Sequence, residues 1–138
     1  MNGIVLDCSV TASWCLRDET NEEANKILDL LKDHQAFVPA IWPVEMANVL
    51  VVAERRGRIS AADVARMVEI LLGLPIEIEN AALDNLKTLR LLAREYRLSA
   101  YDACYLDLAQ RRGFPIATLD SLLNRAAKKC GITTLIGK

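Results

Sequence analysis

Ile4-Val5-Leu6-Asp7-Cys8-Ser9 begins with three apolar residues and passes directly into an acid. Together with the preceding glycine, this short run without a polar residue is typical of a strand buried on both faces of a sheet. A second apolar run near the other end, Ile116-Ala117-Thr118-Leu119-Asp120, also leads into an acid. Segments with helical patterns lie between the two runs, so the sequence predicts an α/β fold.

Strands and helices are predicted to alternate along the whole chain. Strands are expected at residues 3–6, 36–39, 76–78, 116–118 and 133–135. Helices are expected to begin at Ser9, at the Thr-x-x-Glu capping box 20–23, near Pro43, and at Ser60, Asn80, Ser99 and Asp120. Helix ends are expected at Gly57, Gly73, Gly113 and Gly131. Such alternation implies a mostly parallel sheet that is covered by helices on both faces.

The composition fits one domain with a sizeable core. The chain has 138 residues, of which 52% are hydrophobic and 25% are charged, and this balance argues against disorder. Apolar stretches such as 49–53 are far too short to cross a bilayer, and no signal-peptide pattern is present. We therefore expect a single domain spanning residues 1–138, a cytoplasmic location and no membrane association.

Basic residues occur in clusters although the formal net charge is only −1. Removing the four negative charges of the acids discussed below from −1 leaves +3, which is a mildly basic remainder. Such a surface around a metal-loaded acidic cleft would attract a polyanion. Cations near helix C-termini also complement the helix dipole, and this interpretation is favoured for any single cluster. The clusters are Arg55, Arg56 and Arg58; Arg111 and Arg112; and Arg125, Lys128 and Lys129.

Four acids lie where the chain is predicted to enter a helix: Asp7, Glu45, Asp102 and Asp120. Taken singly, each has a structural explanation as a turn, cap or first-turn residue. Taken together they indicate more, because the helix N-termini of a parallel sheet collect at its carboxyl edge. Four carboxylates in one cleft repel each other unless a cation lies between them. The pattern therefore indicates a hydrolytic site for a divalent metal and a phosphate ester.

Three polar residues are expected to support these acids. Ser9 and Thr118 lie two residues from the first and the last acid, and Asn48 lies about one helical turn after the second. Hydroxyl and amide groups so placed can orient carboxylates or hold metal-bound water. Asp107, five residues after Asp102, is rotated away around its helix and is interpreted as a solvated or interface residue.

The sequence lacks the residues that several other catalytic mechanisms require. A single histidine, His34, at a predicted helix end leaves no Ser-His-Asp or Cys-His arrangement and no histidine pair. Four cysteines without a C-x-x-C pair argue against zinc and for reduced, mostly buried thiols. Dinucleotide and P-loop motifs are absent from the sequence. Metal-assisted hydrolysis remains, with Mg²⁺ or Mn²⁺ as the fitting ions, and without metal at least one acid should have a raised pKa.

Two predicted helices are apolar on nearly every face. They include residues 44–53 and 64–72. A helix of this kind is either deeply buried or shared with a partner. The sequence leaves both interpretations open.

The four acids lie in segments that together closely resemble the PIN-domain ribonucleases, and in particular the VapC toxins of toxin–antitoxin pairs. The segments are I-V-L-D-C-S (4–9), P-V-E-M-A-N (43–48), S-A-Y-D-A-C-Y-L-D-L-A (99–109) and F-P-I-A-T-L-D (114–120). The resemblance implies a three-layer α/β/α sandwich with a central, mostly parallel sheet, and Mg²⁺- or Mn²⁺-dependent cleavage of RNA. By position it assigns the catalytic and metal-binding roles to Asp7, Glu45, Asp102 and Asp120, with Ser9 and Thr118 beside them.

The resemblance also implies partners. Toxins of this kind usually form homodimers and are silenced by a cognate VapB-type antitoxin that reaches into the site, which would cover the apolar helices. At Asp107 a small apolar residue is commoner in such proteins. Two alternatives remain open: a PIN nuclease of RNA maturation or decay, and a catalytically inactive binding or assembly module. The presence of all four acids argues against the inactive module.

Overall fold

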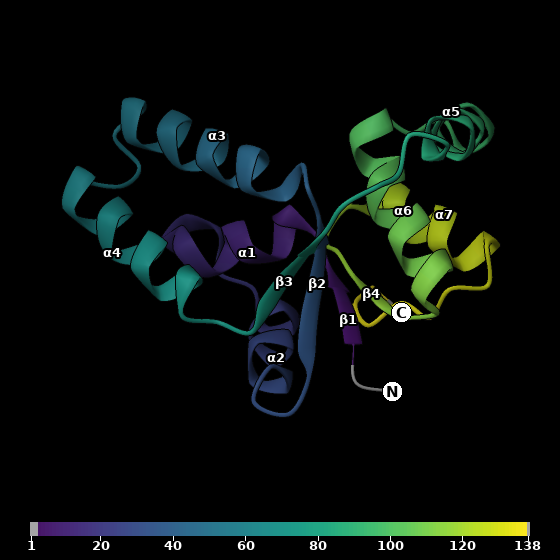
Figure 1. Ribbon diagram of the computed structural model, residues 1–138. Coiled ribbons are helices and arrows are strands. Elements are labelled where there is room, and N and C mark those ends of the chain that lie inside the picture. Colours follow the sequence, from purple (N-terminus) through teal and green to yellow (C-terminus); the bar gives the residue numbers. More distant parts are fainter. Residues whose placement is uncertain (1–2, 138) are drawn as a thin grey trace.

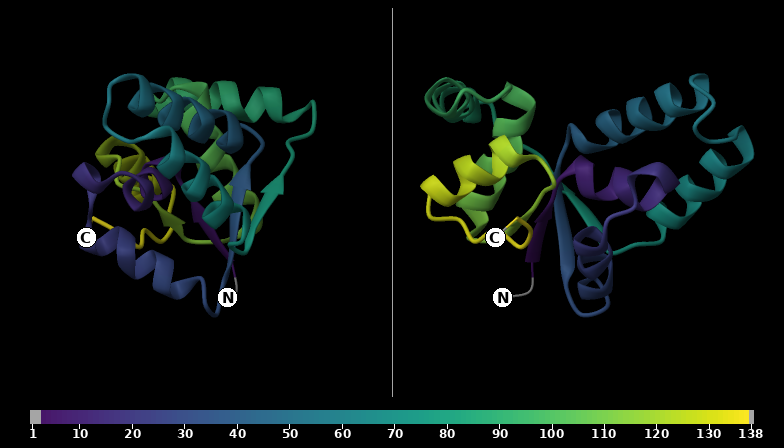
Figure 2. Two further views of the ribbon diagram at one scale, coloured as in Figure 1. Left: turned by 90° about the vertical axis from the view of Figure 1, so that its left-hand side faces the viewer. Right: turned by 180° about the vertical axis from the view of Figure 1, so that it is seen from behind.

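The computed structural model describes residues 3–137 and shows a parallel sheet between two layers of helices (Figures 1 and 2). The strands are β1 (Gly3–Leu6), β2 (Gln35–Pro39), β3 (Ile76–Glu79) and β4 (Ile116–Ala117). The helices are α1 (Cys8–Cys15), α2 (Glu22–Leu30), α3 (Trp42–Arg55), α4 (Ala61–Leu72), α5 (Asn85–Tyr96), α6 (Ala100–Arg112) and α7 (Ser121–Lys129), with a 3₁₀ turn, η1, at Arg17–Glu19. The strand order is β3-β2-β1-β4, and each neighbouring pair is parallel.

Helices cover both faces of the sheet. In Figure 1, α1, α3 and α4 lie on one side, with α2 below them, and α5, α6 and α7 lie on the other; the view from behind in Figure 2 shows the same division. The predicted α/β/α sandwich is therefore confirmed. Because all four strands point the same way, their carboxyl ends converge near the centre of Figure 1, next to the start of α1.

The first strand is buried along its whole length, which explains why its sequence carries no polar residue. β1 lies between β2 and β4, and Val5 is paired with Ile116. The ring of Phe114 packs over Gly3 so closely that a Cβ at this position would lie 2.5 Å from the ring. Only glycine fits there without a shift of the aromatic side chain.

The strand predicted at 133–135 is not formed. A single bridge joins Thr134 to Ile116, and the backbone N of Leu135 donates to the carbonyl O of Ile116 at 3.0 Å. β4 itself has two residues, so it offers too few backbone groups for a ladder to continue into this segment.

Two helices have an N-terminal cap residue other than the predicted one. α1 begins after Asp7, and the hydroxyl of Ser9 donates to the Asp7 carboxylate at 2.6 Å instead of capping the helix. α2 begins after Asn21, whose side chain accepts a hydrogen bond from the backbone N of Ala24 at 3.1 Å. Thr20, the predicted cap, instead donates its hydroxyl to the preceding turn.

The start of α5 was predicted four residues too early: the predicted cap was Asn80, and the observed cap is Asp84. The backbone N of Ala82 donates to Oδ1 of Asn85 at 2.9 Å, which holds the approach to the helix in a turn. Leu83, which precedes the helix, is 89% exposed in this turn. Tertiary contacts of Asn85 therefore override the local capping signal.

Three other starts are as predicted. The side chains of Ser60, Ser99 and Asp120 accept hydrogen bonds from first-turn backbone N–H groups of α4, α6 and α7. Gly113 ends α6 with a φ of +67°, a left-handed conformation that favours glycine. These local signals fix the helices that carry the last two acids.

The helices α3 and α4 expose much of their apolar surface, so deep burial does not explain their composition. The exposed apolar residues are Val44, Val51, Val68, Ile70 and Leu72. An apolar groove of about 280 Å³ lies between α3, α4 and β3, and its lining includes Trp42, Met46, Leu50, Leu71, Leu72 and Ile76. Within residues 3–137 no helix combines the length and apolar character needed to cross a membrane.

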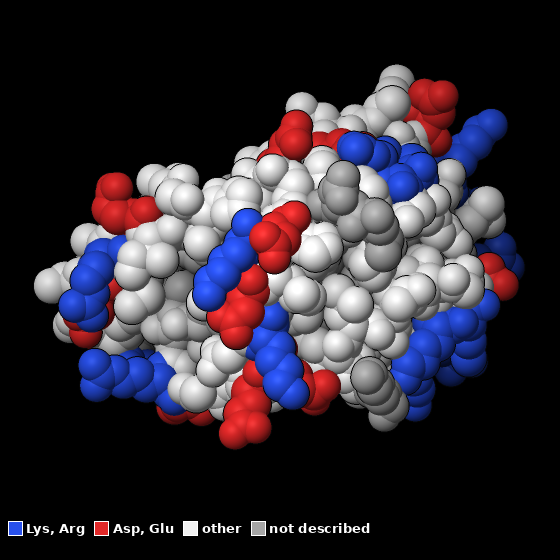
Figure 3. All heavy atoms as spheres, turned by 90° about the horizontal axis from the view of Figure 1, so that it is seen from below, with Lys and Arg blue, Asp and Glu red and all other residues white. Residues whose placement is uncertain are grey.

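Charged side chains of both signs share the surface. Figure 3 shows Lys and Arg interspersed with Asp and Glu across the middle of the lower face, and gathered toward its right-hand edge. Arg58 is paired with Asp18 at 2.8 Å and with Glu19 at 2.5 Å. Lys128 and Lys129 lie in the last turn of α7, where cations complement the helix dipole. Ion pairing and helix ends therefore account for much of the basic clustering.

Candidate active site

The four acids of interest lie at the carboxyl edge of the sheet. Asp7 directly follows β1, and Asp120 follows β4, the strand paired with β1. Glu45 lies in the first turn of α3, which follows β2, and Asp102 lies in the first turn of α6. The right-handed parallel arrangement thus brings together carboxylates from four separate parts of the chain.

A pair of hydroxyls holds Asp7 in place. Ser9 Oγ and Thr118 Oγ1 both donate to Oδ2 of Asp7, at 2.6 and 2.7 Å. Ser9 Oγ in turn accepts from the backbone N of Leu119 at 2.9 Å, and Thr118 Oγ1 accepts from the backbone N of Asp120 at 3.0 Å. The predicted placement of the two hydroxyls beside the first and last acids is therefore what the structure shows, and the network fixes the rotamer of Asp7.

Burial and mutual repulsion shape the electrostatics of this edge. Burial raises the pKa of Asp7, opposed in part by the hydroxyls of Ser9 and Thr118, and the charge of Asp120 raises it further. Burial likewise raises the pKa of Asp102, with added contributions from the charges of Asp7 and Asp120. Each of these carboxylates is therefore harder to ionise in the absence of a cation than a free aspartate.

Glu45 has a partner that the sequence analysis did not identify. The hydroxyl of Tyr105 donates to Oε1 of Glu45 at 2.5 Å, and the Tyr105 side chain is fully buried. Burial raises the pKa of Glu45, the bond from Tyr105 opposes this, and the charges of Asp7 and Asp102 raise it further. Burial and the bond to Glu45 raise the pKa of Tyr105, which keeps the phenol a donor. Its position three residues after Asp102 was the only available sequence signal.

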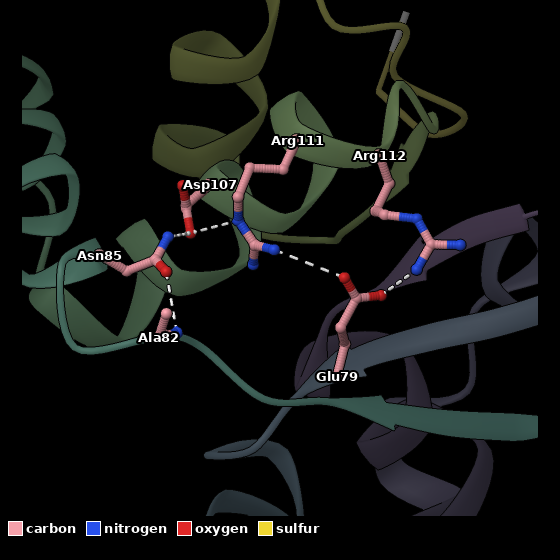
Figure 4. Close-up of polar contacts among 6 residues, drawn as sticks. All are labelled: Glu79, Ala82, Asn85, Asp107, Arg111 and Arg112. Carbon is pink, nitrogen blue, oxygen red and sulfur yellow. Dashed lines mark hydrogen bonds and ion pairs between the residues drawn. The ribbon is translucent and has the colours of Figure 1, made fainter.

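The surroundings of Asn48 and Asp107 differ from those that the sequence analysis predicted. Asn48 is exposed on α3 and takes no part in the hydroxyl network around Asp7. Asp107 was interpreted as solvated or interfacial, which is wrong: it is 2% exposed. Its carboxylate accepts hydrogen bonds from Arg111 and Asn85, which compensate its burial (Figure 4).

The cysteines beside the site are suited to packing. Cys8 and Cys15 are buried free thiols, and Cys104 and Cys130 are half-buried. Burial, followed by the charges of Asp7 and Glu45, raises the pKa of Cys8 to about 12. Its Sγ donates to Sδ of Met46 at 3.4 Å. A thiol so strongly protonated is a poor nucleophile, so Cys8 serves the core below the acids.

The donor set fits Mg²⁺ or Mn²⁺ in its chemistry. The four acids supply carboxylate oxygens, the ligands that these ions prefer. Burial is the main cause of the raised pKa values of Asp7, Glu45 and Asp102, and the charges of neighbouring acids add to it. Across the part of the chain that the structure describes, no three Asp, Glu, His or Cys side chains are grouped tightly enough to hold one ion as they stand. Binding would therefore require side-chain rotation, for which the partly exposed Asp102 has room. Asp120 is also partly exposed, but its Oδ1 caps α7.

Comparisons with known proteins agree with the observed fold. A family model described as "PIN domain" matches residues 4–129. The protein "Ribonuclease VapC3" of Pyrobaculum aerophilum is 28% identical over 122 residues, which cover 87% of this chain and 91% of that protein. A crystal structure of PAE2754 from Pyrobaculum aerophilum superposes with a TM-score of 0.73 at 20% identity, over 97% of this chain and 84% of that one. A toxin–antitoxin complex from Klebsiella pneumoniae superposes with a TM-score of 0.68 at 21% identity, over 98% of this chain and 99% of that one.

Proposed function

The chain belongs to the PIN-domain family, and we propose that it is an endoribonuclease that hydrolyses RNA phosphodiesters with Mg²⁺ or Mn²⁺. The observation that carries the proposal is the convergence of Asp7, Glu45, Asp102 and Asp120 at one sheet edge, with Asp7 fixed by two hydroxyls. The relative named as a ribonuclease supports RNA as the substrate.

The residues of this chain would share the work in distinct ways. A bound divalent ion would supply Lewis-acid chemistry, since it polarises a phosphate and lowers the pKa of water. Asp7, the most buried of these four acids, gives a rigid anchor, because both hydroxyls restrain one of its oxygens. Asp102 and Asp120 are more exposed, which leaves their carboxylates accessible to an ion together with a polyanionic substrate. Their mutual repulsion disfavours the empty site and favours a cation.

We further propose that the protein is the toxin of a toxin–antitoxin pair, forms a homodimer and is bound by a VapB-type antitoxin. The structural neighbour described as a toxin–antitoxin complex supports an antitoxin partner. The apolar groove between α3 and α4 offers a surface for an amphipathic helix of that partner, with Trp42 and Leu72 among its lining.

The nuclease proposal is tested with purified protein, metal and RNA. Asp102→Asn should lower the rate of RNA cleavage in Mn²⁺ by roughly a hundredfold or more, because removing one carboxylate weakens the only cation site proposed. Asp33→Asn, at an exposed position outside the site, serves as the matched control and should cleave like the parent. Products should carry a 5′-phosphate and a 3′-hydroxyl. Parent-like cleavage by Asp102→Asn, or cleavage that persists in excess chelator, would show the site assignment to be wrong.

A further inference from the structure

The bond between Tyr105 and Glu45 joins two layers of the molecule. Glu45 belongs to α3 on one side of the sheet, and Tyr105 belongs to α6 on the other side (Figure 1). Sixty positions separate the two residues in the chain, and their side-chain oxygens lie 2.5 Å apart. The bond therefore crosses the carboxyl edge of the sheet, between the helix that carries Glu45 and the helix that carries Asp102.

The two partners differ in their freedom to move. Tyr105 has no exposed surface, so packing holds its ring and leaves its hydroxyl in one place. Glu45 is only partly buried, and a glutamate side chain has three rotatable bonds. Among the hydrogen bonds of residues 3–137, the Glu45 carboxylate accepts at Oε1 only, from this phenol. A rigid donor thus restrains a side chain that would otherwise sample several rotamers.

We propose that Tyr105 is a positioning residue for Glu45, holding Oε1 so that Oε2 is presented to a divalent cation. This inference rests on the proposed function, because it gives Glu45 a cation to bind. Hydrogen-bond partners of this type orient metal-binding carboxylates and reduce the ordering that binding must impose. α6 would then contribute to two of the four acids. It carries Asp102, and through Tyr105 it would orient Glu45, which belongs to α3.

The test measures Mn²⁺ affinity by calorimetry, independently of RNA cleavage. Tyr105→Phe keeps the ring and removes only the hydroxyl, so it should weaken Mn²⁺ binding roughly tenfold. Tyr101→Phe is the matched control, because Tyr101 lies on the same helix but is 59% exposed, and its Mn²⁺ affinity should stay at the parent value.

A double-mutant cycle separates positioning from general packing. If Tyr105 acts through Glu45, adding Tyr105→Phe to Glu45→Gln should change Mn²⁺ affinity by less than about twofold, whereas the same change in the parent weakens it roughly tenfold. Equal weakening in both backgrounds would overturn the proposal, since the effect would not depend on the Glu45 carboxylate. A Tyr105→Phe variant with the Mn²⁺ affinity of the parent would overturn the proposal as well, but it would not contradict the proposed nuclease function. No Mn²⁺ binding by the parent would remove both the proposed function and this inference.

A second measurement uses the unchanged chain, in case Tyr105→Phe does not fold. The protein has three tyrosines, so labelling the tyrosine ring carbon that bears the hydroxyl gives a simple NMR spectrum. Mg²⁺ should shift the Tyr105 signal, because its acceptor Glu45 changes charge environment on binding. The signal can be assigned by elimination with Tyr101→Phe and Tyr96→Phe. A Tyr105 signal that stays unchanged at saturating Mg²⁺ would contradict the proposal.

Discussion

The Asp107 carboxylate and the Arg111 guanidinium, one turn apart on α6, form a hydrogen-bonded ion pair of 3.0 Å whose acid is almost fully buried. Asn85 Nδ2 donates to the same carboxylate oxygen at 3.1 Å. Arg111 also reaches Glu79 at the end of β3, and Glu79 is in turn paired with Arg112 (Figure 4). The network therefore ties the edge strand and the start of α5 to the helix that carries Asp102.

Asp107→Ala should lower the free energy of unfolding by about 1–3 kcal/mol, because it leaves the Asn85 amide and the Arg111 cation without their shared acceptor. Arg111 is partly exposed, so water replaces some of the lost interaction and a larger loss is not expected. Urea unfolding measures the change. Asp63→Ala is the control: its pair with Arg66 is exposed on both sides, and the change should stay within about 0.5 kcal/mol. An equal loss in both variants would contradict a special role for the buried acid.

Asp7→Asn should stabilise the metal-free protein at neutral pH. Burial raises the pKa of Asp7 above the ordinary value of 3.8, so between the two values the folded state binds more protons than the unfolded state. The stability of the parent therefore falls as pH rises through that window, and asparagine removes this dependence. The advantage of Asp7→Asn should shrink as pH is lowered below the folded pKa. Thermal unfolding in chelator at several pH values measures the difference.

Mn²⁺ should reverse that order of stability. A ligand that binds only the folded state stabilises it by about 2.7 kcal/mol at a hundred times its Kd, and Asp7→Asn should gain much less of this. Asp33→Asn, at an exposed position, should follow the parent under both conditions. If Asp7→Asn were less stable than the parent without metal, the prediction would be wrong. The buried Asp7 carboxylate would then stabilise the folded state.

The two glycines that end α4 and α6 should respond differently to alanine. Gly113 has a φ of +67°, so Gly113→Ala should cost about 1–2 kcal/mol of folding free energy. Gly73 has a φ of −87° and its nearest Cβ neighbour would lie at 3.5 Å, so Gly73→Ala should be neutral or slightly stabilising. Parallel urea titrations of the two variants provide the comparison. Equal losses at both positions would show that the φ value does not decide the effect.

A charge in the apolar groove should weaken antitoxin binding. Leu72 is 75% exposed and lines the groove, so Leu72→Glu should reduce affinity for the proposed VapB-type antitoxin at least tenfold. Leu83→Glu is the control, because Leu83 is 89% exposed but lies outside the groove lining. Calorimetric titration compares the variants. Parent-like binding by Leu72→Glu would place the partner on another surface.

Local signals made the fold predictable, and long-range contacts made part of the site unpredictable. The short apolar run at Gly3–Leu6 and the caps at Ser60 and Ser99 act through neighbouring residues, so the sequence alone located them. The buried state of Asp107 depends on Asn85, which lies 22 positions earlier. Arg111, one turn after Asp107, was a local signal of an ion pair, but the contact with Asn85 could not be read from the neighbourhood of Asp107.

The difference between local signals and long-range contacts also explains which residues around the acids could be predicted. Ser9 and Thr118 were predictable because each lies two positions from an acid, although Thr118 bonds to the acid at the far end of the chain. Tyr105 was missed because its partner, Glu45, lies on another helix in the opposite layer. Asn48 was predicted from helical spacing, but spacing alone does not determine whether a side chain turns toward solvent.

The hydrogen bond from Thr118 to Asp7 spans 111 positions, and β4 joins the sheet beside the first strand of the chain. During translation, the Asp7 segment therefore leaves the ribosome long before its hydroxyl partner has been made. The acidic edge is complete only after residue 120 has emerged and β4 has docked. A nascent chain consequently lacks the assembled cluster, although the residues of α3 and α4, which line the apolar groove, have already been synthesised.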